Sequence, residues 1–130
     1  MLDAQVWDGI GPLLQEVVHA VMSPFDVPAK VDHVRGVPPV VNDPVCVEIL
    51  RRATVAALGP DAAVSTPQSL GGEDFAWYLQ EVPGALARLG TGTPGGETYD
   101  LHQGDLVVDE RAVVAGAQLL ASTALARGAI

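Results

Sequence analysis

The sequence predicts an α/β fold in two parts that are joined by a proline-rich linker. Three observations carry this prediction. Helical and extended patterns alternate along the chain, the stretch "PPVVNDP" at residues 38–44 interrupts them, and 48% of the 130 residues are hydrophobic. That hydrophobic content is sufficient for a packed core. Because proline donates no ladder hydrogen bond, the interrupting stretch is expected to be a linker and not a central strand.

The first part is predicted to contain one helix and one strand. Apolar residues recur at steps of three and four over residues 2–22, which predicts an amphipathic helix. Gly9, Gly11 and Pro12 lie inside this pattern, so we expect a bend, or a helix that begins near Pro12. Residues 29–37 alternate between valines and polar side chains, as in a half-exposed strand. One helix and one strand cannot bury a core alone, so their neighbours are expected elsewhere in a larger protein.

The second part is predicted to alternate helices with short strands. Asp43 is the expected N-cap and Pro44 the first residue of its first helix, which Gly59 and Pro60 close. Asp109 is the expected N-cap of its last helix. The expected helices span residues 44–58, 73–81 and 106–128, and the expected strands span residues 62–67 and 84–92. In the last helix the predicted inward stripe consists of Val113, Val114, Ala117, Leu120, Ala121, Ala124 and Leu125.

Charge and composition exclude several classes of function. The net charge is −9 and the pI about 4.4, which argues against nucleic acid or an anionic membrane as a partner. No apolar run is long enough to cross a bilayer, and Asp3 and Asp8 stand where a secretory signal would be basic. A cytoplasmic protein is therefore expected. The single cysteine, Cys46, excludes an internal disulfide and a metal cluster built from cysteines alone.

Two places in the second part are candidates for chemistry. Gly71 and Gly72 precede a predicted helix, where backbone N–H groups and the helix N-terminus favour a bound carboxylate. The alternative for this pair is a tight turn without a ligand. His102 stands in a glycine-rich loop near Asp100 and Asp105, and a neutral imidazole there could bind a transition metal. A single histidine is not a metal site by itself, because zinc takes three or four ligands.

The quoted segments "VDHVRGVPPVVND", "GGEDFAWYLQEVPGALARLGTG", "LH" and "VVDERAVVAGAQLLASTAL" together resemble the C-terminal part of the metal-dependent amidohydrolases. This group includes bacterial N-acyl-amino-acid amidohydrolases, hippurate hydrolase and plant auxin-conjugate hydrolases. The resemblance runs in order over nearly the whole chain, from Leu2 to about Leu125. It implies that residues 1–41 are the last helix and strand of an inserted α+β lid domain. Residues 42–130 would be the C-terminal half of a three-layer αβα catalytic domain.

The resemblance also implies a centre of two divalent metals in the complete enzyme. The metal would be zinc, manganese or cobalt. His102 corresponds to the last metal ligand of that centre, and Gly71 and Gly72 correspond to its substrate-binding loop. The Cys-x-His and Glu-Glu motifs that supply most ligands and the general base do not occur in this sequence. After the histidine the family usually has Ser or Asn and then Pro, whereas this chain has Gln103 and Gly104, which changes the surroundings of the ligand.

The sequence therefore predicts part of an enzyme that hydrolyses the amide bond of N-acyl amino acids or similar small amides. No catalytic residue is assigned, and the chain alone is expected to be inactive and to hold no metal stably. The expected partners are the N-terminal half of the catalytic domain, the small substrate, and a second copy bound through the lid. The alternatives are a non-catalytic dimerisation or interaction module and a degenerate product of a split gene.

Overall fold

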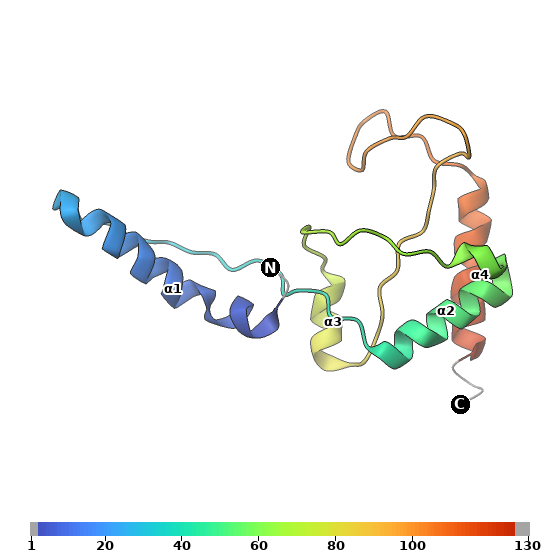
Figure 1. Cartoon of the computed structure of the whole chain (residues 1–130), viewed down its shortest axis with the longest axis horizontal. Coiled ribbons are helices and arrows are strands. Elements are labelled where there is room, and N and C mark those ends of the chain that lie inside the picture. The colour runs from blue at the N-terminus through green and yellow to red at the C-terminus, as the bar shows by residue number, and fades with distance from the viewer. Residues whose placement is uncertain (1–2, 127–130) are drawn as a thin grey trace. The chain divides into compact units, whose positions relative to one another are not determined.

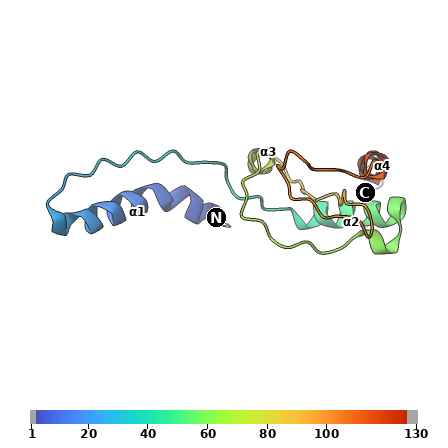
Figure 2. The ribbon, with the colours of Figure 1, turned by 90° about the horizontal axis from the view of Figure 1, so that it is seen from above.

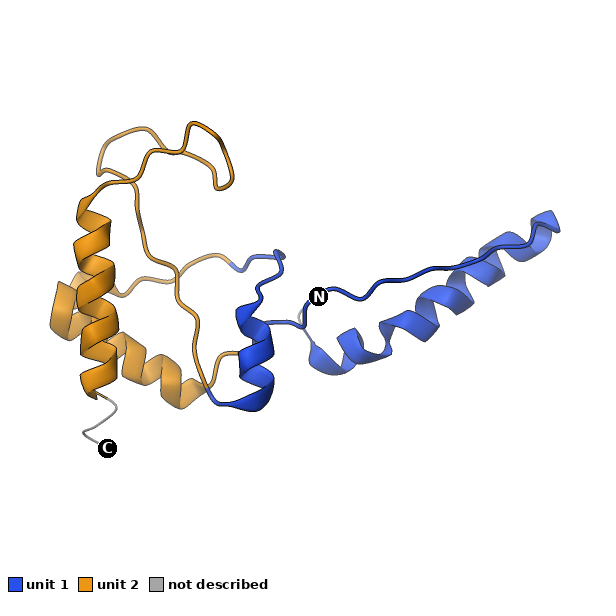
Figure 3. Ribbon diagram, turned by 180° about the vertical axis from the view of Figure 1, so that it is seen from behind, with its two compact units in different colours: residues 1–41, 68–83 blue, residues 42–67, 84–130 orange. Residues whose placement is uncertain are grey.

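The computed structural model describes residues 3–126 and contains four α-helices (Figure 1). They are α1 (Ala4–Met22), α2 (Pro44–Leu58), α3 (Phe75–Glu81) and α4 (Arg111–Ala126), with short 3-10 helices at Ser23–Phe25 and Pro60–Ala62. The chain forms two compact units, one from residues 1–41 and 68–83 and the other from residues 42–67 and 84–130 (Figure 3). The expected division into a lid domain, residues 1–41, and a catalytic domain, residues 42–130, stays a prediction.

Helix α1 in the first unit begins at Ala4 and continues through Pro12, so the predicted late start is wrong, whereas the predicted bend stays a prediction. Its N-terminus is capped by Asp3, whose carboxylate accepts from the N–H of Val6 at 2.9 Å. Proline at position 12 leaves the carbonyl of Asp8 without its usual helical donor. The guanidinium of Arg35 lies 3.5 Å from this oxygen and donates to it. The carbonyl oxygen of Asp8, which has no helical donor because of Pro12, thus accepts from a side chain outside the helix. This contact helps the helix to continue through the proline.

The segment after α1 is extended and returns along the helix (Figures 1 and 2). Near the far end of α1, the ring Nε2 of His19 hydrogen-bonds to the carbonyl of Ala29 at 3.1 Å. Near the start of α1, the Arg35 guanidinium lies 3.9 Å from the ring centre of Trp7 and pairs with Asp8 at 3.1 Å. Trp7 is 8% exposed, and Trp77 of α3 packs edge-on against it at 5.7 Å. Trp7 is therefore a buried residue of this unit, as is Ala76, and the partly exposed Trp77 and Arg35 pack against its ring.

The three predicted strands are wrong for the part of the chain that the structure describes. Residues 29–37 and 84–92 and most of residues 62–67 are extended, but no residue between 3 and 126 belongs to a strand. A β-strand is defined by its ladder of hydrogen bonds to a neighbouring strand. The extended segments make no such ladder with one another. The sequence pattern therefore identified the local conformation correctly and the pairing incorrectly.

In the second unit, α2 packs against α4 (Figure 1). The predicted limits of α2 are confirmed: Asp43 accepts from the N–H of Cys46 at 2.9 Å, and Gly59 ends the helix with a φ of 100°. Ala53 of α2 is 3% exposed. Gly116 of α4 lies close to the extended segment before the helix, since a Cβ at this position would lie 3.0 Å from the Cδ2 of Leu89. Small residues thus allow close packing of the helices and the neighbouring segment.

The predicted inward stripe of α4 is wrong. Val113 is 70% exposed, Leu120 73% and Leu125 79%, whereas Ala112, Ala115 and Leu119 are half-buried. Helix α4 packs against α2, and its half-buried residues include the small Ala112 and Ala115. Several large apolar residues of α1 are also exposed, at 52% for Leu13 and 60% for Val21. Both α1 and α4 have the amphipathic pattern, but the described residues leave much of the apolar face of each of these two helices exposed.

The extended segment after α3 is fixed to the start of α2. The side chain of Asn42 donates to the carbonyl of Leu86 and accepts from its N–H, both at 2.9 Å. The N–H of Asp43 donates to the carbonyl of Gly84 at 2.9 Å. An asparagine amide has one donor and one acceptor edge, so it pairs with an extended backbone as a neighbouring strand would. This arrangement leads the chain along α4 toward the loop that carries His102.

Candidate functional site

His102 lies in the loop of residues 92–108, which precedes α4 and forms the lobe beyond its N-terminal end (Figure 1). Its side chain is exposed, and its backbone has a φ of 66°, in the left-handed region. Histidine enters this region more often than most residues that carry a Cβ, but the conformation still has to be held by its surroundings. The loop therefore presents the imidazole at an unusual backbone position.

The two ends of this loop meet at Asp109. The N–H of Asp109 donates to the carbonyl of Thr91 at 2.7 Å, across the base of the loop. The carboxylate of Asp109 accepts from the N–H of Arg111 at 3.0 Å and from its guanidinium Nε at 2.9 and 3.1 Å, and it also contacts Nη2. The predicted capping role of Asp109 is thus confirmed, because its side chain holds an N–H of the first turn of α4.

The electrostatics of Asp109 agree with this geometry. The Arg111 guanidinium, and then the backbone N–H of Arg111, hold the pKa of the Asp109 carboxyl well below its usual range, with a smaller lowering from the Thr93 side chain. The same pair raises the pKa of Arg111. Both groups are therefore charged at neutral pH. The side chain of Asp109 is 13% exposed and that of Arg111 is 74% exposed, so the carboxylate is the sheltered partner.

The residues of the described chain do not by themselves make a metal centre. Between residues 3 and 126, no group of three or more His, Cys, Asp and Glu side chains lies close enough together to hold a metal ion. His102 offers one imidazole nitrogen, and structural and catalytic zinc sites take three or four protein ligands. A metal centre that included His102 would therefore need further ligands from outside this set of residues.

Gly71 and Gly72 both have structural reasons to be glycine. A Cβ at Gly71 would lie 3.2 Å from the hydroxyl oxygen of Ser69, which also accepts from the N–H of Gly71 at 3.1 Å. A Cβ at Gly72 would lie 2.7 Å from Cγ2 of Val37, closer than side-chain atoms approach. The helix that follows begins at Phe75 and not at residue 73. These observations favour the alternative of a turn, while the role of both glycines in substrate binding stays a prediction.

The predicted site residues fall in different units of the structure. Gly71 and Gly72 belong to the first unit and His102 belongs to the second, and each unit is described separately. Sequence reasoning missed Asn42 and Thr91 as parts of the framework that leads to the His102 loop. No local signal could have identified them, because their partners Leu86 and Asp109 lie far along the chain.

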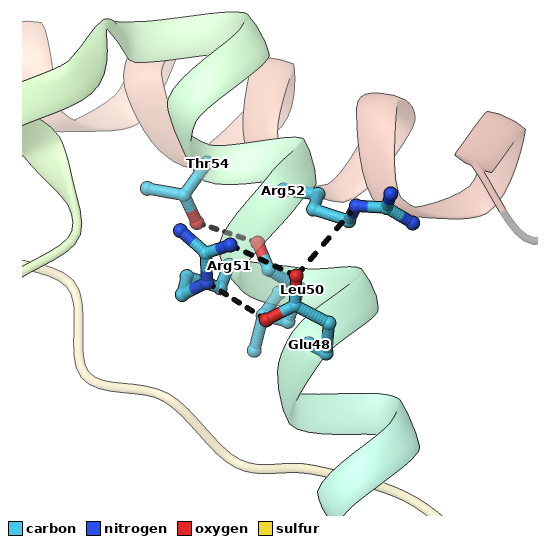
Figure 4. A network of polar contacts seen from close by, with 5 residues as sticks. All are labelled: Glu48, Leu50, Arg51, Arg52 and Thr54. Carbon is cyan, nitrogen blue, oxygen red and sulfur yellow. Dashed lines mark hydrogen bonds and ion pairs between the residues drawn. The ribbon is translucent and has the colours of Figure 1, made fainter.

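A charged cluster on α2 is a second concentration of ionisable groups (Figure 4). Glu48 accepts from Nε and Nη2 of Arg51, both at 2.8 Å, and lies 3.6 Å from Nε of Arg52. Their side chains are between 50% and 73% exposed. The hydrogen bond from Arg51 lowers the pKa of Glu48. Exposed pairs one helical turn apart are ordinary surface features of a helix, so this cluster is no candidate site.

None of the helices described between residues 3 and 126 combines the length with the hydropathy that crossing a membrane requires.

Comparisons with known proteins assign the family. The sequence profile described as peptidase family M20/M25/M40 matches residues 2–126. The chain belongs to this family, which confirms the resemblance to the amidohydrolases. M20 peptidases are generally metal-dependent hydrolases, and membership points to an α/β peptidase fold. No solved structure matched the chain.

Three relatives show how the match is distributed. A protein of Rhodococcus jostii named "Putative glutamate–cysteine ligase 2-3" is 43% identical over 116 residues, which cover 89% of this chain and 15% of that protein. A probable hydrolase of Synechocystis sp. is 36% identical over 85% of this chain and 29% of its own length. The N-acetyl-L-cysteine deacetylase of Bacillus subtilis is 29% identical over 94% of this chain and 28% of its own length. The chain thus spans less than a third of each of these relatives.

Proposed function

We propose that this chain is the C-terminal portion of a metal-dependent amidohydrolase that cleaves the amide bond of N-acyl amino acids or similar small amides. The observation that carries the proposal is the family match, which extends over residues 2–126. Further support comes from relatives named N-acetyl-L-cysteine deacetylase, amidohydrolase and IAA-amino acid hydrolase. The ligase name of the Rhodococcus relative describes a protein of which the chain matches only 15%, so it does not guide the proposal.

In this proposal His102 is one ligand of a centre of divalent metals. Its imidazole is exposed and therefore accessible to a neighbouring segment that carries further ligands. When bound, such a metal polarises a carbonyl and lowers the pKa of water. The remaining ligands and the general base come from the N-terminal half of the catalytic domain. Because no three potential metal ligands lie together among the described residues, the chain alone is inactive in this proposal.

The extended segments 29–37 and 84–92 support the same proposal. Their backbones have the conformation of strands, yet they make no ladder among the described residues. Buried backbone groups require hydrogen-bond partners. In the complete protein these segments therefore pair with strands contributed by the rest of the enzyme. In the same proposal, the backbone of Gly71 and Gly72 lies at the substrate end of the site and faces the substrate carboxylate.

The test of this proposal measures amide hydrolysis by the isolated 130-residue chain. The purified chain is assayed with Zn²⁺, Mn²⁺ or Co²⁺ on a series of N-acetyl amino acids, beside His102→Ala. No hydrolysis above the His102→Ala control is expected from the chain alone. The N-terminal portion of the Synechocystis or Bacillus relative is then added, and activity that depends on His102 is expected to appear. Hydrolysis by the chain alone, above the control, would contradict its proposed inactivity.

A second candidate is a non-catalytic module that binds another copy of the chain through the lid. The observation that favours it is the exposed apolar face of α1, where Val6 is 53% exposed, Leu13 52% and Val21 60%. Such a module is folded and monodisperse as a dimer without any N-terminal portion. Sedimentation of the isolated chain separates the two candidates, because a module sediments as one dimeric species whether or not the N-terminal portion is present.

A further inference from the structure

The loop that carries His102 has almost no support of its own. Within residues 92–108, its hydrogen bonds are local: Gly96 to Thr93 at 2.9 Å, Leu106 to Gln103 at 3.3 Å, and Tyr99 to Glu97 at 3.3 Å. Each of them joins residues two or three positions apart. Leu101 is 68% exposed and Val107 60% exposed, so apolar packing does not fix the loop either. The position of His102 must therefore be set mainly where the loop begins and ends.

At that point the chain is held from both sides. The extended segment that enters the loop is paired with Asn42 through Leu86, packs Leu89 close to Gly116, and ends at Thr91. The first turn of α4 receives the chain that leaves the loop. Asp109 joins these two supports, because its backbone N–H binds Thr91 while its carboxylate binds Arg111. One residue thus connects the entry of the loop with the start of the helix.

We infer that Asp109 is a positioning residue for His102: it closes the base of the 92–108 loop and so holds the imidazole at its place in the proposed metal centre. This inference rests on the proposed function for the meaning of His102, but the closure itself is independent of any metal. Fixing both ends of a flexible loop reduces the number of conformations that it can adopt. The left-handed backbone of His102 depends on this restriction, since an open loop would relax to a less strained conformation.

The chain offers graded variants. Asp109→Ala removes both the helix cap and the ion pair with Arg111. Asp109→Asn keeps an oxygen that accepts from the N–H of Arg111 but removes the charge, and Arg111→Met removes the guanidinium while leaving the cap. Glu48→Ala is the matched control, because Glu48 is also a carboxylate paired with arginine in the same unit, on a different helix (Figure 4).

Three readouts on the 130-residue chain test the inference without metal or substrate. The first is the hydrogen-exchange rate of the amide at position 109, which reports the bond to Thr91. The second is the rate of chymotrypsin cleavage after Tyr99 or Leu101. The third is the NMR signature of His102, from its ring resonances and the backbone coupling that reports φ.

In Asp109→Ala we expect exchange and cleavage to accelerate roughly five- to tenfold, as for the loss of one or two hydrogen bonds. The His102 signals should broaden or shift toward averaged values. Asp109→Asn and Arg111→Met should each give a smaller effect, and Glu48→Ala none. If Asp109→Ala fails to fold, the graded effects of Asp109→Asn and Arg111→Met still decide the question.

The inference is overturned if Asp109→Ala only frays the first turn of α4 while loop cleavage and the His102 signals stay as in the parent chain. Asp109 would then be a helix cap and nothing more. Because these readouts involve no catalysis, a negative result leaves the proposed amidohydrolase function standing. Conversely, absence of activity in the complete enzyme would not remove a closure observed by exchange and cleavage.

Discussion

At the scale of single residues, the close approach of Gly72 to Val37 makes a sharp prediction. The Cβ of an alanine at position 72 would lie 2.7 Å from Cγ2 of Val37, and the backbone of Gly72 is outside the left-handed region. The cost of Gly72→Ala is therefore steric. We expect a loss of about 1–2 kcal/mol in the free energy of unfolding, as for an overpacked site, measured by urea denaturation.

The control and the rescue for this prediction come from the same unit. Gly36→Ala places a Cβ in open space, so its effect should be small or slightly stabilising. Val37→Ala removes the methyl group that obstructs position 72. In the double variant, the loss in the free energy of unfolding should be about 1 kcal/mol smaller than the sum of the losses in the two single variants. Additive effects would show that the two residues are not in contact.

Residues also show what the sequence can and cannot predict about the site. Asp43 and Asp109 were recognisable as caps, because each binds an N–H group only two or three positions ahead. The pairing of Asn42 with Leu86 and the bond from Asp109 to Thr91 join positions that are distant in the chain. No periodicity or propensity encodes such bonds. The loop that carries His102 was therefore predictable, but the residues that hold it were not.

At the scale of elements, helix α2 predicts a pH dependence. The backbone N–H of Cys46 lowers the pKa of Asp43 below its usual range, so the charged carboxylate is the form that the folded state favours. A group with a lowered pKa contributes stability fully above its unfolded pKa of about 3.9. That contribution is lost as the pH falls through the lower pKa that Asp43 has in the folded state.

Asp43→Ala should therefore destabilise α2 at neutral pH, and the difference from the parent chain should shrink as the pH falls below about 4. Helix content measured by circular dichroism during urea unfolding at several pH values checks this. Asp61→Ala is the control, because Asp61 is an exposed carboxylate of the same unit that makes no side-chain hydrogen bond among the described residues. An equal loss at pH 7 and at pH 3 in Asp43→Ala would contradict the capping role.

The elements also explain why helices were predicted better than strands. The limits of α2 follow from Asp43, Pro44 and Gly59, whose effects act within one turn of the helix. A strand exists only with its neighbour, and the extended segments of this chain find none among the described residues. Similarly, the valine and leucine pattern of α4 predicted an apolar face but not which face meets α2.

At the scale of the whole molecule, the chain has a helical framework with its larger apolar side chains mostly exposed. The hydrophobic residues buried among those described are Trp7, Ala53 and Ala76, two of which have small side chains. The chain spans 29% of the Synechocystis relative and 28% of the Bacillus deacetylase. The exposed apolar faces and the single candidate metal ligand agree with the proposal that the chain functions as part of a larger amidohydrolase.

The most direct test of this account is the activity of a chimera. The 122 residues of this chain that match the Bacillus subtilis N-acetyl-L-cysteine deacetylase replace the corresponding segment of that protein, and release of acetate from N-acetyl-L-cysteine is measured with divalent metal. The account predicts activity that His102→Ala lowers by at least about 100-fold, because loss of a ligand should exceed the roughly 10–100-fold loss that follows mutation of residues supporting the ligands. His33→Ala, the histidine control, should leave the activity unchanged. A folded chimera with equal activity in the presence and absence of His102 would contradict the central claim.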